Sequence, residues 1–119
     1  MSTIKQSLAD LLSIDGAMCC ALVDYTSGMI LGQAGSGVDL DIAAAGNTEV
    51  MRAKLNTMKS LGLNDSIEDM LITLGKQYHI LRPMATQDGL FIYLVLDKTK
   101  ANLALARRKV LDIEKLLKI

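Results

Sequence analysis

The stretch LFIYLVLDKTKANLALARR, residues 90–108, decides the fold of this 119-residue chain. Residues 90–96 are all apolar, so a strand formed by them has two apolar faces. A strand of that kind lies in the middle of a sheet that is covered on both sides. Charged residues at positions 97, 98 and 100 end the strand, and a helix with an apolar stripe follows. The stretch therefore predicts a central strand and one of the helices that cover the sheet.

The helix expected from about Thr99 to Leu117, with Thr99 as its cap, has two different sides. Apolar residues at alternating spacings of three and four predict one stripe in the core: Leu103, Ala106, Val110, Ile113 and Leu117. The opposite side is basic and includes Arg107 and Arg108. From residue 97 onward there are seven basic and three acidic residues, a net charge of +4, which leaves −4 for the rest of the chain. The basic side is either a solvated surface or a docking face for an acidic partner.

Hydrophobic periodicity and turn residues predict eight elements in the order α-β-β-α-β-β-β-α. A helix capped by Ser2 or Thr3 opens the chain and ends at Asp15-Gly16. A second long helix is expected at residues 39–61, and strands are expected at residues 17–23, 29–31, 67–74, 78–84 and 90–96. Three helices and five strands indicate an α+β fold, an antiparallel sheet with one helix on one face and two on the other. We expect residues 1–119 to form a single domain.

The composition argues against several classes of protein. Thirteen basic and thirteen acidic residues give a net charge of zero, whereas nucleic-acid binders normally carry a basic excess. Three tyrosines and one phenylalanine are few for a base-stacking platform. No apolar run is long enough to span a membrane, and residues 1–10 do not resemble a signal peptide. We therefore expect a cytoplasmic protein that binds no nucleic acid and does not insert into a membrane.

The residue types that most often carry chemistry form no recognisable site. Cys19 and Cys20 are neighbours on an expected strand, so they point to opposite faces and cannot easily bridge, and two cysteines give no zinc spacing. His79 is the single histidine, and its place in an expected strand favours a structural role over a metal site or a catalytic triad. Glu68 and Asp69 also lie in an expected strand, where they would protect a sheet edge from unwanted pairing. We expect no metal site, no cofactor and no catalytic residues.

Residues 32–37, GQAGSG, precede the second helix and suggest a phosphate-binding loop. The match is poor because such a loop has Lys and then Ser or Thr after its last glycine. Here Asp39 and Asp41 follow, and carboxylates at the positive end of a helix repel phosphate. The segment is therefore expected to be a flexible connection.

The second helix has two apolar sides, although a helix that covers a sheet needs only one. The bulky side suits the sheet and consists of Ala44, Met51, Leu55 and Met58. The smaller side suits another helix, because Gly and Ala let two backbones come close. A two-fold axis beside it would bring in the same side of a second copy, and the strand at residues 67–74, if it lies at the sheet edge, could pair with its mate. We therefore predict a homodimer with these interface candidates: Gly46, Val50, Ala53, Ile67, Asp69 and Leu71.

Several short motifs resemble those of the Roadblock domain family, which is named for a dynein light chain. DKTKANLALAR at residues 97–107 is similar to that family's junction between the last strand and the last helix. The first hairpin, residues 14–31, and GLFI at residues 89–92 also resemble the family, and the element order extends the resemblance over nearly the whole chain. The resemblance implies a profilin-like sandwich that dimerises, with two five-stranded sheets joined edge to edge and the second helices side by side. It also implies no catalytic residues, since members are dynein light chains, platforms for Ras-like small GTPases or bacterial regulators of partner GTPases.

The leading hypothesis is a non-catalytic, dimeric module that binds and regulates or scaffolds a Ras-like small GTPase, with Arg107 and Arg108 as docking candidates. One alternative is a small-molecule sensor, which needs a cavity with converging polar groups. Another is a structural adaptor of the dynein light chain kind. An enzyme is disfavoured because no nucleophile, base and orienting group occur together in the sequence.

Overall fold

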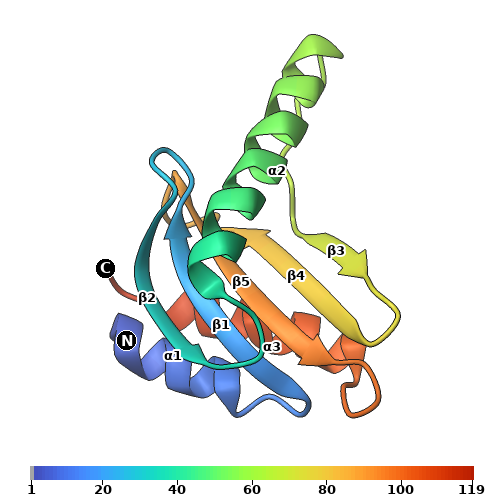
Figure 1. The fold of residues 1–119 in the computed structure, drawn as a ribbon. Helices are drawn as coiled ribbons and strands as arrows, with labels where there is room; N and C mark the ends of the chain where they lie inside the picture. Colours follow the sequence, from blue (N-terminus) through green and yellow to red (C-terminus); the bar gives the residue numbers. More distant parts are fainter. Residues whose placement is uncertain (1) are drawn as a thin grey trace.

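The computed structural model describes residues 2–119 and contains the eight expected elements in the expected order (Figure 1). The helices are α1 (Ile4–Leu12), α2 (Leu40–Ser60) and α3 (Leu103–Leu116). The strands are β1 (Ala17–Asp24), β2 (Met29–Gly35), β3 (Met70–Thr73), β4 (Gln77–Pro83) and β5 (Leu90–Asp97). All neighbouring strands are antiparallel, and their order in the sheet is β2-β1-β5-β4-β3. The predicted α+β class is confirmed.

The central position predicted for residues 90–96 is also confirmed. β5 lies between β1 and β4, and its residues 90–96 are all buried. Alternate side chains of β5 enter two core layers, Ile92, Leu94 and Leu96 on one face and Phe91, Tyr93 and Val95 on the other. The first layer includes residues of α1 and α3, and the second includes residues of α2. One helix therefore covers one face and two cover the other, as Figure 1 shows.

The cap predicted for α1 is confirmed, and the cap predicted for α3 is not. Thr3 caps α1, because its Oγ1 accepts from the N–H of Gln6 at 3.2 Å while Oε1 of Gln6 accepts from the N–H of Thr3 at 3.0 Å. The prediction that Thr99 caps α3 is wrong. The carboxylate of Asp97 accepts from the N–H and the hydroxyl of Thr99 and closes a turn, so α3 begins later and its cap is Asn102.

The glycine-rich segment is largely strand, so the expectation of a flexible connection over residues 32–37 is wrong for its first part. β2 continues to Gly35 and pairs with β1 along its length. A Cβ at Gly32 would lie 2.8 Å from side-chain atoms of Ile4 and Leu8, so the absent side chain lets α1 pack directly on the strand. The glycines here serve close packing and leave Ser36 and Gly37 as the turn toward α2.

β3 is shorter than the strand predicted at residues 67–74, and Glu68 and Asp69 lie outside it. The carbonyl oxygen of Glu68 accepts from Nη1 of Arg82 at 2.9 Å, and the carboxylate of Asp69 binds Arg107. The side chains of Arg82 and Arg107 therefore hold this segment in place, whereas a strand would be held by hydrogen bonds to the backbone of the neighbouring strand. The prediction that both acidic residues lie in a strand and protect its edge is therefore wrong.

Candidate interaction surface

The two sides of α2 differ in what they contact. Its start is capped by Asp39, whose carboxylate accepts from the N–H groups of Asp41 and Ile42 at 3.0 and 3.2 Å. The C-terminal half of the helix extends past the sheet (Figure 1). The bulky side is the buried one, as predicted: Ala44 and Met51 lie in the core layer beneath the helix, Leu55 packs against that layer, and Met58 is buried outside it.

The smaller side of α2 is exposed to solvent. Val50 is 41% exposed, and a Cβ added at Gly46 would meet nothing within 4 Å. The same side continues into Ile42, 71% exposed, and Leu61, 66% exposed, which the sequence reasoning missed although they follow the same helical spacing. We call this uncharged row the α2 stripe: Ile42, Gly46, Val50, Ala53, Thr57 and Leu61.

β3 lies at an edge of the sheet, as the dimer prediction required. Of the three interface candidates around it, Leu71 lies in the strand and its side chain is exposed. Ile67 precedes the strand and packs against the core layer beneath α2. Asp69 also precedes the strand and binds Arg107. The exposed edge candidate is therefore Leu71.

The two arginines predicted to dock a partner both have partners within the chain. Nε and Nη2 of Arg107 lie 2.8 and 2.9 Å from the two carboxylate oxygens of Asp69, which raises the pKa of Arg107 further through hydrogen bonds and charge. Nε of Arg108 lies 3.4 Å from Asp112, one helical turn away, and both side chains are exposed. The contact of Arg107 with Asp69 joins α3 to the segment before β3, so this cation is engaged within the chain. Arg108 is the more accessible of the two cations.

A buried ion pair links α3 to β4, and sequence reasoning missed it. Glu114 is 2% exposed; its Oε1 accepts from Nε of Arg82, and its Oε2 accepts from the N–H of Ala85 at 2.9 Å. Arg82 also donates to the carbonyl of Glu68. One carboxylate therefore fixes α3, β4 and the segment before β3 relative to one another. The sequence offered no signal for this, since Glu114 lies within a helix rich in charged residues.

His79 on β4 belongs to a polar network beside α2. Its Nδ1 lies 2.9 Å from the hydroxyl of Tyr93, and its Nε2 lies 2.8 Å from Oε1 of Gln77. Because an amide oxygen can only accept, Nε2 carries the proton and Nδ1 accepts from the Tyr93 hydroxyl. Burial lowers the pKa of His79 from its ordinary 6.5 and raises the pKa of Tyr93 to about 12, so both groups are neutral at pH 7.5. A hollow of about 480 Å³ runs along α2 here, and its lining includes Ile42, Gly46, Asn47, Val50, His79 and Tyr93.

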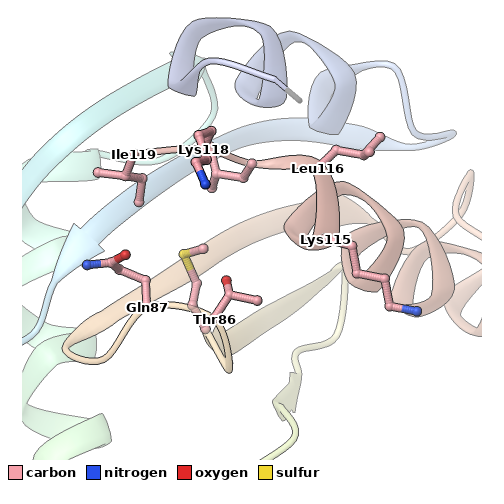
Figure 2. Close-up of a pocket in the computed structure, with 8 residues that line it drawn as sticks. Thr86, Gln87, Lys115, Leu116, Lys118 and Ile119 are labelled. Carbon is pink, nitrogen blue, oxygen red and sulfur yellow. The ribbon is translucent and has the colours of Figure 1, made fainter.

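A second hollow, of about 310 Å³, lies between the end of α3 and the turn that joins β4 to β5 (Figure 2). The figure shows Thr86 and Gln87 on the turn and Lys118 and Ile119 on the end of the chain. All four side chains are exposed. Exposed side chains without a buried, converging polar group do not form a preorganised ligand site.

The other reactive groups lie in unreactive surroundings. Cys19 and Cys20 are buried and unbridged, and burial raises the pKa of both thiols, that of Cys20 to about 12. Over residues 2–119, no group of three or more His, Cys, Asp or Glu side chains is arranged to bind a metal ion. Within the same range, no helix has the length and apolar character to cross a membrane.

No family model and no curated protein matches the sequence. Solved structures do match the fold. A Roadblock/LC7 domain from Streptomyces avermitilis has a TM-score of 0.82 at 12% identity, over 97% of this chain and 94% of that one. MglB from Myxococcus xanthus has a TM-score of 0.79 at 16% identity, over 94% and 91% of the two chains. An MglB with a tetrameric arrangement has a TM-score of 0.69 at 18% identity, over 94% and 88%.

These similarities extend over nearly the whole length of both chains in each comparison. This chain therefore has the fold of the Roadblock/LC7 domains.

Proposed function

We propose that this chain is a non-catalytic, cytoplasmic interaction module that dimerises through the α2 stripe and binds a Ras-like small GTPase, which it regulates or scaffolds. The observation that carries the proposal is the exposure of the α2 stripe. Its large members Ile42 and Leu61 are 71% and 66% exposed, and it has no charged member along the length of the helix. An exposed apolar row of this length marks a surface for another protein.

The stripe is complementary to itself. Ile42 and Leu61 lie at equal distances along the chain from the point between residues 51 and 52. Gly46 and Thr57 are also placed symmetrically about that point, as are Val50 and Ala53. A two-fold axis there would set each residue opposite its counterpart in an antiparallel pair of α2 helices, as an isologous contact requires. Glycine and alanine at the contact would let the two helices approach closely.

The fold and the sequence resemblance support this assignment. Roadblock domains, as the resemblance implies, form dimers with their second helices side by side and serve small GTPases. One MglB of the same fold is described in a tetrameric arrangement. The exposed edge strand β3 offers a second contact on the side of the sheet away from β2.

Light scattering coupled to size exclusion tests the dimer. We expect a dimer at tens of micromolar, and we expect Ala53→Arg to give a monomer because two charges would meet at the contact. Ala45→Arg is the matched control, since Ala45 is exposed on α2 but lies outside the stripe. Val50→Glu combined with Ala53→Arg should restore the dimer, because residue 50 would face residue 53 of the second copy. A monomeric wild-type protein would refute the proposal, and a dimeric Ala53→Arg variant would show that another surface forms the contact.

The partner is tested by pull-down from lysate loaded with either GTP analogue or GDP, followed by mass spectrometry. We expect recovery of a small GTPase, and its absence under both conditions would count against the assignment. Arg107→Glu with Arg108→Glu should abolish binding if the basic side of α3 is the docking face. Arg108→Glu alone must be measured beside the double variant, because it leaves the Arg107–Asp69 ion pair intact. Retained binding with a normal circular dichroism spectrum would assign these charges to solubility.

A further inference from the structure

The network around His79 connects α2 to three strands. Asn47 on α2 lines the same hollow as Tyr93 and lies near the Tyr93 hydroxyl, which also contacts His79. His79 in turn binds Gln77, and Nε2 of Gln77 lies 3.8 Å from the sulfur of Met18 on β1. Asn47 and Tyr93 also line the hollow that runs along the α2 stripe. His79 therefore lies directly beneath the surface proposed for self-association.

A proton on His79 would reverse part of this network. In the neutral ring Nδ1 accepts from Tyr93, whereas in the imidazolium Nδ1 is a donor. The Tyr93 hydroxyl would then have to turn its hydrogen away from His79, and Asn47 would have to offer its amide oxygen to satisfy it. One proton on β4 would thus change the hydrogen bonding of a side chain on α2.

The surroundings of His79 disfavour the imidazolium. Its pairing partners across the neighbouring strands are apolar, Ile72 on β3 and Val95 on β5. Among the residues that line the hollow, Asp39 is the acidic one, and its carboxylate already caps α2. The other titratable or charged residues on α2 are Asp41, Glu49, Arg52, Lys54 and Lys59, and those on the strands are Cys19, Cys20, Asp24, Tyr78, Arg82, Tyr93 and Asp97. Of these, Tyr93 contacts the His79 ring.

We propose that His79 makes self-association through the α2 stripe sensitive to pH, so that protonation of His79 weakens the dimer. The inference rests on the dimer proposed above. A second copy seated on the stripe would cover the hollow and remove water from His79, which disfavours its charged form further. The free chain then binds the proton more readily than the dimer does. Association is strongest above the pKa of His79 in the free chain and weakens as the pH falls below 6.5 through that pKa.

The size of the effect follows from linkage. A dimer contains two copies of His79, so its dissociation constant rises by up to about 100-fold per pH unit between the two pKa values of the free and the assembled chain. We expect a rise of at least about tenfold between pH 7.5 and pH 5.0. No other side-chain type has an ordinary pKa between 5 and 8, and the chain has one histidine.

The test is sedimentation equilibrium of the wild-type protein and of His79→Gln at both pH values. The glutamine variant keeps hydrogen-bonding groups but cannot take up the proton, and we expect its dissociation constant to change less than about twofold. A wild-type dissociation constant that does not change would overturn the inference and leave the dimer standing. Equal pH dependence in His79→Gln would overturn the assignment to His79. A wild-type monomer at pH 7.5 would overturn the proposed dimer and this inference with it.

Nitrogen NMR of the imidazole provides a second measurement that does not depend on how the glutamine variant folds. The single histidine makes the signals unambiguous. We expect the Nε2-protonated tautomer at pH 7.5 and a lower pKa for His79 in the wild-type dimer than in the Ala53→Arg monomer. Equal pKa values in the two proteins, or the opposite tautomer, would refute the coupling.

Discussion

Replacing Glu114 with alanine is expected to destabilise this protein more than any change to an exposed residue of α3. The Glu114 carboxylate is the counter-ion of Arg82 and the acceptor for the N–H of Ala85. The side chain of Arg82 is 13% exposed, so it would lose its partner in a site that water reaches poorly. The N–H of Ala85 would lose its acceptor as well.

The expected cost is large relative to the stability of the protein. Removing one partner of a buried ion pair costs about 3 to 5 kcal/mol, whereas the whole free energy of unfolding of a typical domain is about 5 to 15 kcal/mol. For a chain of this size the loss corresponds to a fall in Tm of about 12 to 20 °C, at roughly 4 °C per kcal/mol. Because Arg82 also binds the carbonyl of Glu68, the segment at residues 64–69 should exchange its amide hydrogens faster.

Urea denaturation at one fixed protein concentration measures this cost, since self-association would itself add to stability. Arg108→Ala is the control for an exposed ion pair on the same helix and should cost less than about 1 kcal/mol. Arg82→Met combined with Glu114→Leu removes both charges and should recover most of the loss. A Glu114→Ala variant within about 1 kcal/mol of the wild type, or a double variant as unstable as the single one, would refute the reasoning.

Gly35→Ala is expected to cost about 2 to 4 kcal/mol, because Gly35 has a φ of +82° and an added Cβ would lie within 2.3 Å of the Met18 carbonyl oxygen. Urea denaturation measures it against Gly75→Ala, where the added Cβ has open space in the turn between β3 and β4 and the change should stay within about 1 kcal/mol of the wild type; similar results for the two variants would contradict the packing at Gly35. Cys19 and Cys20 are expected to react with a thiol reagent at pH 8 only after unfolding in urea, because burial raises the pKa of both thiols. Rapid reaction of the native protein would show that β1 opens more readily than its burial indicates.

The sequence by itself determined the elements and the sides they bury. Residues 90–96 are apolar on both faces and therefore occupy the centre of the sheet. The two apolar sides of α2 were also predicted from spacing, and one of them is buried while the other is exposed. These features depend on periodicity and on contacts within a few residues, as does the Thr3 cap of α1. Such local patterns can be predicted from residues that lie close together in the sequence.

The tertiary structure decided which polar groups meet. β3 begins at Met70 because Arg82 and Arg107 bind the segment before it, 14 and 38 residues away along the chain. Gly32 lies in a strand because β2 pairs with β1, and its missing side chain leaves room for α1. His79 meets Tyr93 because β4 pairs with β5. Glu114 is buried although it lies in a helix rich in charged residues. Hydrogen bonds and ion pairs between distant residues depend on how whole elements pack, and no periodicity within one element specifies its partner on another.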